Sequence, residues 1–493
     1  MKMTYFTPPE EQFPAAPFMD LGDFDKVDMI ESPPGLYGQE PPRAVNNRQL
    51  GILGVVSITY MYICAGPIGS EEVISSSGPL LGLLGFLVYA LLIAFPYAYI
   101  VAELCSAFPE DGGFTVWVLN AFGPFWGFQV GYWSWIAGVL RGALVPGTLL
   151  DLITKFYKLD IKSAGLEYAI KMAIAIVLAA PTLLGTRAVS RLSILVMTLV
   201  LLFFSVFTVW ALVKASDFDD LFEVRHEVTE YNPETKDLTL SGDTAIHWVT
   251  LLNTLFYKYK GINNASVFGG EVQNPARSYS RAIAITMLLI VATYVVPVAA
   301  GLASDGLPWS MLDRDSFPFL AFSIGGSFLR GLIQVAACCA SAGMFIAMLH
   351  VKAFMLSGMA ENRLVPELLG RRSNRFQSPT NSALLTLVLM LALLSVDFDD
   401  MLPMTNAYSA AAQLLIIAAV VRLRRELPYI PRPTKVPGGV LVLYSIAVLP
   451  TFMFGYITFY AFSSTVSAIL MVAFFVPGVA YGAYRFHYRR ALA

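Results

Sequence analysis

The stretch ICAGPIGSEEVISSSGPL, residues 63–80, decides how this chain is interpreted. It continues an apolar run that starts near Leu50, and a membrane helix needs about 20 mostly apolar residues. The stretch nevertheless carries three residues that interrupt helices and then two adjacent carboxylates: Gly66, Pro67, Gly69, Glu71 and Glu72. Backbone groups freed inside a membrane are tolerated only where they are buried in protein or line a cavity. The stretch therefore predicts a broken membrane helix beside a cavity.

The composition is that of a membrane protein with several spans. Of the 493 residues, 56% are hydrophobic and 14% are charged, whereas soluble domains carry roughly 25% charged residues. The net charge of −2 gives no basic bias toward nucleic acid. The cysteines all fall in apolar runs and lack the spacing of a disulfide framework or a metal site. Since no nucleotide loop, nucleophile elbow or zinc-protease motif is found, we expect neither an enzyme nor a cofactor.

The hydropathy pattern predicts an all-α protein with about twelve membrane helices. Helices are expected because each satisfies its own backbone hydrogen bonds in lipid. The predicted spans lie near residues 50–73, 80–105, 122–150, 168–186, 192–214, 246–270, 281–303, 330–356, 380–396, 402–421, 437–458 and 465–484.

Proline content and charge set the expected topology. Residues 1–46 hold eight prolines and an acidic excess, which predicts a disordered cytoplasmic tail. Arginine and lysine gather in alternate short loops, namely TRAVSR, NPARSYSR, ENRLVPELLGRRSNRF and RLRRELPYIPRPTK. Because cytoplasmic loops carry such an excess, we expect both termini in the cytoplasm. The loop 217–243 on the opposite side has nine acidic residues, which predict a solvated loop or else a mouth that enriches cations.

A second interrupted segment lies in the predicted sixth helix. The sequence LLNTLFYKYKGINNASVFGGEVQNPAR, residues 251–277, contains Gly261 within the apolar run and Glu271 near its end. Interrupted helices at corresponding positions of two halves indicate an inverted-repeat transporter. Helices 1–5 would then repeat as helices 6–10. The predicted parts are a core at 47–425, with repeats near 47–215 and 244–425, followed by helices 11 and 12 at 436–493.

The two breaks also indicate what the cavity would bind. The N-terminus of a half-helix presents backbone N–H groups and a positive dipole end to a substrate carboxylate. Freed carbonyls can coordinate an amine or a cation, and glycines let a substrate approach the backbone closely. The pattern predicts a secondary active transporter that works by alternating access around a site between the breaks.

Six blocks of sequence, taken in order, resemble one transporter family. They are AGPIGSEE, VAELCSAFPEDGGFTVWV, AFGPFWGFQVGYWSW, GGEVQNPARSYSRAI, GMAENRLVPELLGRRS and PRPTKVPGG. Across about residues 48–440 the chain resembles the amino acid–polyamine–organocation (APC) superfamily, above all its eukaryotic branch of polyamine uptake and L-type amino acid transporters. The resemblance implies a leucine-transporter-like core of five plus five inverted helices, unwound in helices 1 and 6, in a plasma membrane.

The resemblance also implies roles for individual residues. In the family, the unwound part of helix 1 touches the amine and carboxylate ends of the substrate, and its motif matches Gly66, Pro67, Ile68, Gly69 and Ser70. The acidic residue of the GPxGxE pattern matches Glu71. The glutamate at the cytoplasmic end of helix 2 matches Glu103, and the inner half of helix 6 matches the stretch that ends at Glu271. We expect these three glutamates, with Lys258, to serve in coupling or gating.

The chain departs from polyamine-type members where a polycation would bind. Those members resemble WNxNYWD in helix 6, whereas residues 257–263 here read YKYKGIN, with Asn263 at the aspartate position. In helix 8, residues 343–352 read GMFIAMLHVK where relatives resemble GLFEAEMSSD, so Lys352 replaces an acidic position. Arg141 adds a basic residue in helix 3. A bare polyamine needs fixed negative charge, which these changes remove.

Basic residues at membrane depth need a reason, because an ionised side chain there costs about 2.5–3.5 kcal/mol on insertion scales. Lys258 and Lys260 lie about 200° apart around a helix, so we expect one to line the site, with Glu71 as its partner, while the other reaches outward. A lysine in the site could be neutral and couple transport to protons, or both could extend to the interface. Arg141 is either paired or binds a carboxylate. The residues expected at the site in helix 6 are Phe256, Tyr257, Lys258, Lys260, Gly261 and Asn263, the first two as a gate.

The main hypothesis is a proton-coupled carrier of amino acids, with the substrate carboxylate on the helix 1 backbone and its amine near helix 6 and Glu71. The alternative is a carrier of polyamines such as putrescine or spermidine, which the resemblance alone supports. A third alternative is a nutrient sensor that binds but does not transport. The loop between helices 3 and 4 has no cysteine, so we expect no disulfide-linked heavy chain.

Overall fold

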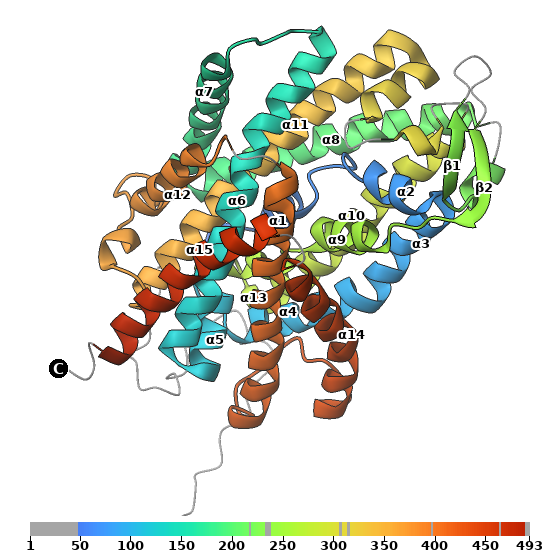
Figure 1. Ribbon diagram of the computed structural model, residues 1–493. Helices are drawn as coiled ribbons and strands as arrows, with labels where there is room; N and C mark the ends of the chain where they lie inside the picture. Colours follow the sequence, from blue (N-terminus) through green and yellow to red (C-terminus); the bar gives the residue numbers. More distant parts are fainter. Residues whose placement is uncertain are drawn as a thin grey trace, which may run out of the picture. The chain divides into compact units, whose positions relative to one another are not determined.

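The computed structural model describes residues 48–215, 218–231, 238–304, 308–312, 316–395, 398–462 and 465–488. The predicted disordered tail, residues 1–46, lies outside these ranges, as does part of the loop 217–243. The described residues belong to one unit, Pro42–Ala493, which is built from helices apart from one hairpin (Figure 1).

The helices follow the long apolar runs of the sequence. In chain order they are α1 (Ile52–Ile63), α2 (Glu71–Ser77), α3 (Pro79–Tyr89), α4 (Phe95–Ala107), α5 (Phe114–Phe122), α6 (Pro124–Tyr157), α7 (Ala164–Leu183), α8 (Thr186–Val213), α9 (Trp248–Tyr259), α10 (Pro275–Leu302), α11 (Phe317–Glu361), α12 (Thr380–Ala392), α13 (Phe398–Glu426), α14 (Gly439–Tyr460) and α15 (Thr465–Ala483). The shorter helical turns are η2 (Ala90–Ala94), η3 (Asp219–Phe222), η4 (Ile262–Val267), η5 (Gly269–Glu271), η6 (Trp309–Met311), η7 (Glu367–Gly370) and η8 (Tyr484–Tyr488). The strands β1 (His226–Tyr231) and β2 (Leu238–Thr244) pair antiparallel.

Within the described residues, nine helices are long and apolar enough to cross a membrane, and α3, η2 and α4 together form one of them. These nine coincide with nine of the predicted spans. The predicted helices 1, 6 and 9 correspond to α1, α9 and α12, which have only 12, 12 and 13 residues. The first two are short because each ends at a break. The predicted all-α polytopic fold is confirmed.

Both predicted breaks are present. Between α1 and α2, Gly66 and Gly69 have φ angles of 134° and 77°, which side chains other than glycine rarely allow. After α9, Gly261 has a φ of 112°, and the chain continues through η4 and η5 instead of an α-helix. A Cβ placed on Gly261 would lie 2.7 Å from the Tyr62 ring of α1. The two broken segments therefore lie against each other.

The broken helix α1 lies inside the helical unit. It packs against α8, α10 and α11, while α6 packs against α11 and α13 (Figure 1). Every residue of α1 from Gly54 to its end is buried, as expected for a helix that is apolar on all sides. The Tyr60 hydroxyl and the Thr293 hydroxyl, 3.2 Å apart, join α1 to α10 by a hydrogen bond.

Three features differ from the sequence-based expectations. The predicted loop 217–243 contains the hairpin β1–β2, which is too short and polar to resemble a span. The nine-residue helix α5 lies between two predicted spans and is too short for a 20-residue criterion. Helix α11 begins at Phe317 instead of near residue 330, because it continues through a kink at Gly326, where φ is 66° and ψ is −159°.

Gly261→Ala should destabilise the protein by about 1–3 kcal/mol, because alanine would have to adopt a left-handed backbone and its Cβ would meet Tyr62. The matched control is Gly455→Ala in α14, where nothing lies within 4 Å of the added Cβ. The thermal unfolding midpoint of the purified protein measures both effects. Equal midpoints for the two variants would contradict the close contact between the broken segments.

Candidate functional site

A cavity lies where the two broken helices meet. Its walls come from the α1–α2 break and from α6, α9, α10, α11 and α13. The predicted substrate-binding residues on its wall are Gly66, Ile68, Gly69, Arg141, Tyr257 and Lys258. Those outside its lining are Pro67, Ser70, Glu71, Phe256, Lys260, Gly261 and Asn263. The structure thus brings the glycine motif of helix 1 and two basic side chains to one cavity.

Arg141 closes the end of α1. It projects from α6, is 3% exposed, and donates from Nη1 and Nη2 to the carbonyls of Tyr62 and Ile63, at 3.1 and 3.0 Å. The last carbonyls of a helix have no partner within it. Its Nε donates to the Tyr257 hydroxyl at 3.2 Å, and the guanidinium lies 4.6 Å from the centre of that ring. Neutral groups therefore hold Arg141 at the cavity wall.

Lys258 provides a hydrogen-bond donor to a backbone carbonyl on the other side of the same break, toward α2. Its Nζ donates to the carbonyl of Ile68 at 2.8 Å. The Tyr294 hydroxyl donates to the backbone carbonyl of Lys258 at 3.1 Å and fixes α9 against α10. Hydrogen bonds from charged donors are about twice as strong as neutral ones. The carbonyls on both sides of the helix 1 break thus bind basic side chains that line the cavity.

The two adjacent carboxylates at the start of α2 point in different directions. Glu71 is 1% exposed and accepts the backbone N–H of Phe317, at the start of α11, at 3.2 Å. Glu72 lines the cavity. Successive residues of a helix point about 100° apart, so a single register brings one member of such a pair to the wall. The predicted acidic site residue was Glu71, whereas the carboxylate on the cavity wall is Glu72.

A second, smaller and polar chamber shares Arg141 with the cavity. Lys260, Gly261 and Asn263 line this chamber. The Lys260 ammonium donates to the Thr405 hydroxyl at 3.0 Å and to the Asn406 side-chain oxygen at 2.8 Å, both on α13. The two lysines of helix 6 therefore line different cavities: Lys258 lines the first and Lys260 the second.

Other cavity residues carried no sequence signal. Cys64 and Tyr294 line the cavity, but a single cysteine or tyrosine in an apolar helix has no pattern that separates it from the core. Phe256, a predicted gate, packs instead on Phe454 of α14, with ring centres 5.6 Å apart. Among the described residues, no group of three or more His, Cys, Asp or Glu side chains is placed to hold a metal ion.

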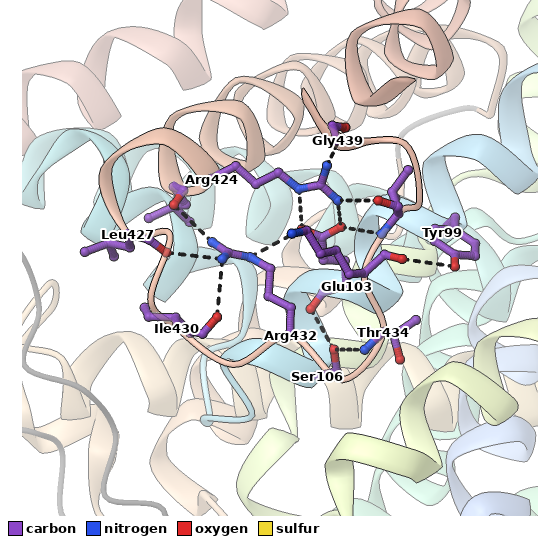
Figure 2. A network of polar contacts seen from close by, with 12 residues as sticks. Tyr99, Glu103, Ser106, Arg424, Leu427, Ile430, Arg432, Thr434 and Gly439 are labelled. Carbon is purple, nitrogen blue, oxygen red and sulfur yellow. Dashed lines mark hydrogen bonds and ion pairs between the residues drawn. The ribbon is translucent and has the colours of Figure 1, made fainter. Parts of the chain in front are cut away.

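Glu103, a predicted coupling residue, lies away from the cavity in a buried ion cluster (Figure 2). It sits near the end of α4 and is fully buried. It accepts from Arg424 of α13, from the backbone N–H of Val436 at 2.9 Å, and pairs with Arg432 at 3.3 Å. Arg424 also donates to the Gly439 carbonyl at 2.8 Å. The cluster pins the connection between α13 and α14 to α4.

Glu271, another predicted coupling residue, belongs to a network centred on Arg372. The Arg372 guanidinium contacts Asp111 at 2.6 Å, Glu361 at 3.0 Å and Glu271 at 3.1 Å. The backbone N–H of Gly270 donates to Asp111 at 2.9 Å. The network therefore ties the turn after α4, the end of the helix 6 break, and the end of α11 together.

One arginine faces three carboxylates in this network, and the excess negative charge affects Glu271. Burial, and then the neighbouring Asp111, raise the pKa of Glu271 from 4.5 to about 7, against the opposing effect of Arg372. The carboxylates conversely raise the pKa of Arg372 above its ordinary value. The charges of the network are therefore better balanced while Glu271 holds a proton. Once Glu271 ionises, its negative charge is repelled by Asp111 and Glu361.

The network and the cavity lie at different levels of α6. The cavity wall includes Arg141 and Thr148, in the second half of that helix. Near its start, Gly131 packs closely against Thr115 and Met359, which lie beside the network in sequence. The network therefore lies toward the end of the protein at which α6 begins, and the cavity lies toward the other end.

The sequence matches the family model described as amino acid permease over residues 52–488. The chain belongs to this family. It is 32% identical over 440 residues to the polyamine transporter RMV1 of Arabidopsis thaliana, which covers 89% of this chain and 86% of that protein. It is 30% identical over 413 residues to the polyamine transporter PUT1 of Oryza sativa subsp. japonica. This match covers 83% of this chain and 73% of that protein. An uncharacterised transporter of Legionella pneumophila is 25% identical over 422 residues. This match covers 80% of this chain and 86% of that protein.

These comparisons confirm the resemblance to the APC superfamily and show that the protein is a transporter and not an enzyme. They do not confirm the prediction of an amino acid substrate. The names of the plant relatives favour the polyamine alternative over it.

Glu103→Gln should destabilise the protein by about 3–5 kcal/mol, because it leaves Arg424 and Arg432 buried without a counter-charge. The control is Arg422→Gln, which removes a half-exposed pair with Glu426 one helical turn away and should change stability by about 0.5 kcal/mol or less. Thermal unfolding in detergent measures both variants. A Glu103→Gln midpoint close to that of the control would show that the cluster is not needed for stability.

The pH dependence of stability should report on Glu271. Since its pKa is raised in the folded protein, its contribution is fully present below pH 4.5 and is lost as pH rises through about 7. The unfolding midpoint of the wild type should therefore fall over this window, and Glu271→Gln should flatten the fall. The control Glu367→Gln, at an exposed position, should leave the wild-type slope unchanged. The same slope in Glu271→Gln would assign the titration to another group.

Proposed function

We propose that the protein transports small organic solutes that carry amino groups, with polyamines as the first candidate substrates. The observation that supports polyamines is the similarity to plant polyamine transporters over 89% and 83% of the chain. Glu72 on the cavity wall supplies a carboxylate for an ammonium group. The rings of Tyr257 and Tyr294 add faces that attract cations.

Amino acids are the second candidate substrates, and the lining of the cavity supports them. Arg141 and Lys258 bring positive charge to the wall, close to the backbone of the helix 1 break. Two cations in a low-dielectric site attract a carboxylate and repel a bare polycation. An amino acid would place its carboxylate near these side chains and its amine near Glu72.

We also propose that transport is coupled to protons and works by alternating access. The carbonyls of Tyr62, Ile63 and Ile68, which could ligate a metal cation, accept instead from Arg141 and Lys258. The Arg372 network lies toward one end, and its Glu271 titrates near neutral pH. We propose that this end faces the cytoplasm, with both chain termini, because the arginine-rich loops lie there.

Uptake into proteoliposomes of labelled putrescine and labelled arginine, each against a panel of polyamines and amino acids, distinguishes the candidates. If polyamines are the substrates, unlabelled spermidine should abolish putrescine uptake and neutral amino acids should not. If amino acids are the substrates, Lys258→Gln should raise their KM about tenfold, because a charge-assisted contact is lost. Their methyl esters should then fail to compete.

The controls distinguish these outcomes from a nonspecific loss of uptake activity. Lys171→Gln removes an exposed ion pair on α7, far along the chain from the breaks, and should leave uptake unchanged. Uptake should persist without sodium and scale with the pH gradient. Saturable binding of either solute without uptake would identify a sensor and contradict the transport proposal, while an ester that competes as well as its free acid would exclude carboxylate recognition.

A further inference from the structure

Three basic side chains are buried together near the second chamber. Arg141, Lys260 and Lys352 are 3%, 6% and 1% exposed. Within the part of the chain that the structure describes, their hydrogen bonds all go to neutral groups, and none of the three pairs with a carboxylate. Buried charges are normally paired or hydrogen-bonded to an opposite charge, because removing a lone ion from water is expensive. The cluster therefore lacks its counter-ion.

Each of these side chains also keeps hydrogen-bonding capacity in reserve. Lys352 donates to Ser134 at 2.9 Å and to Asn264 at 2.7 Å, and both acceptors line the chamber. An ammonium has three N–H donors and a guanidinium has five. Since Lys260 and Lys352 each use two and Arg141 uses three, every one retains at least one N–H donor without an acceptor among the described residues.

Two buried amides complete the lining of the chamber. Gln413 is 2% exposed and makes no hydrogen bond within the described residues. The side-chain oxygen of Asn263, which is also 2% exposed, has no partner either. Buried amides are rarely left unpaired, because each costs the desolvation of its polar atoms. Of the two amides, Gln413 can supply a further N–H donor to the chamber, whereas the Asn263 oxygen is an acceptor and supplies none.

We propose that the second chamber binds a small anion, held by Arg141, Lys260 and Gln413, with Lys352 adding positive charge from behind Ser134 and Asn264. The chemical class is a monovalent anionic group, either a free halide or the carboxylate of a transported solute. The chamber is small, so it suits a halide or a carboxylate group and not a whole polyamine or large amino acid. Because Arg141 also lines the main cavity, the bound anion would neutralise the cation nearest the solute. The inference deepens the proposed transport function but concerns a separate chamber.

The test uses the purified full chain in detergent, with gluconate as the only other anion. Radiolabelled chloride is titrated, and the thermal unfolding midpoint is followed in parallel. Wild-type protein should bind chloride saturably and gain stability with it. Lys260→Gln and Lys352→Gln should each weaken the apparent affinity about tenfold, because each removes one positive charge. Lys171→Gln is the control, since this lysine pairs with Glu167 on α7 and is absent from the chamber lining, and its chloride affinity should equal that of the wild type.

A variant that is expected to fold normally guards against the case in which the lysine variants unfold. Gln413→Leu removes a donor that makes no hydrogen bond to any residue the structure describes, so it should fold and still weaken anion binding. If chloride has no effect but amino acids stabilise the wild type, and this effect is lost in Lys260→Gln and Gln413→Leu, the anion is the carboxylate of the solute. If neither chloride nor amino acids stabilise the wild type in a manner that depends on these residues, the proposal is wrong.

The outcomes also separate this inference from the proposed function. Putrescine uptake that is identical in chloride and gluconate, and in Gln413→Leu and wild type, would overturn the anion site and leave the transporter proposal standing. Chloride binding that depends on Lys260, in a protein that takes up neither polyamines nor amino acids, would support the anion site and contradict the proposed substrates.

Discussion

The structure depends on satisfying the backbone carbonyls that the break in helix 1 leaves without helical partners. In lipid or protein interior an unsatisfied polar group costs several times what a typical hydrogen bond contributes. Arg141 reaches across from α6 to Tyr62 and Ile63, and Lys258 reaches from α9 to Ile68. Removing either cation would therefore disturb the helix break itself and not only the charge of the cavity. The same contacts fix the positions of α6 and α9 relative to α1.

This requirement has a consequence for selectivity. Because Arg141 and Lys258 hold the break, positive charge is built into the wall that a solute must touch. The plant relatives are similar in sequence over most of the chain and carry the name of polyamine transporters, but a fold does not by itself determine what a site binds. In the proposed function, the balance between Glu72 and the two cations would decide whether an ammonium group alone is accepted. An anion in the neighbouring chamber would shift that balance toward cationic solutes.

Much of the fold could be predicted from the sequence, because long apolar runs and helix-breaking residues are local signals. The residues of the site were harder to predict from the sequence. Whether Glu71 or Glu72 faces the cavity depends on the register of α2, which only packing sets. The opposite orientation of Lys258 and Lys260 follows from helical geometry, but which cavity each meets does not. The partners of Glu103 lie more than 300 residues away in α13 and its following loop, so no local pattern could identify them.

The two ends of the protein are linked through the helix 6 break. Lys258 precedes this break and touches the cavity, and Glu271 ends it within the Arg372 network. The intervening turns η4 and η5 are short 3-10 turns instead of an α-helix, and every residue of η4 is buried. The backbone carbonyl of Glu271 also accepts from the N–H of Leu50, just before α1. A proton lost from Glu271 would therefore place the repulsion from Asp111 and Glu361 at the ends of both broken helices together.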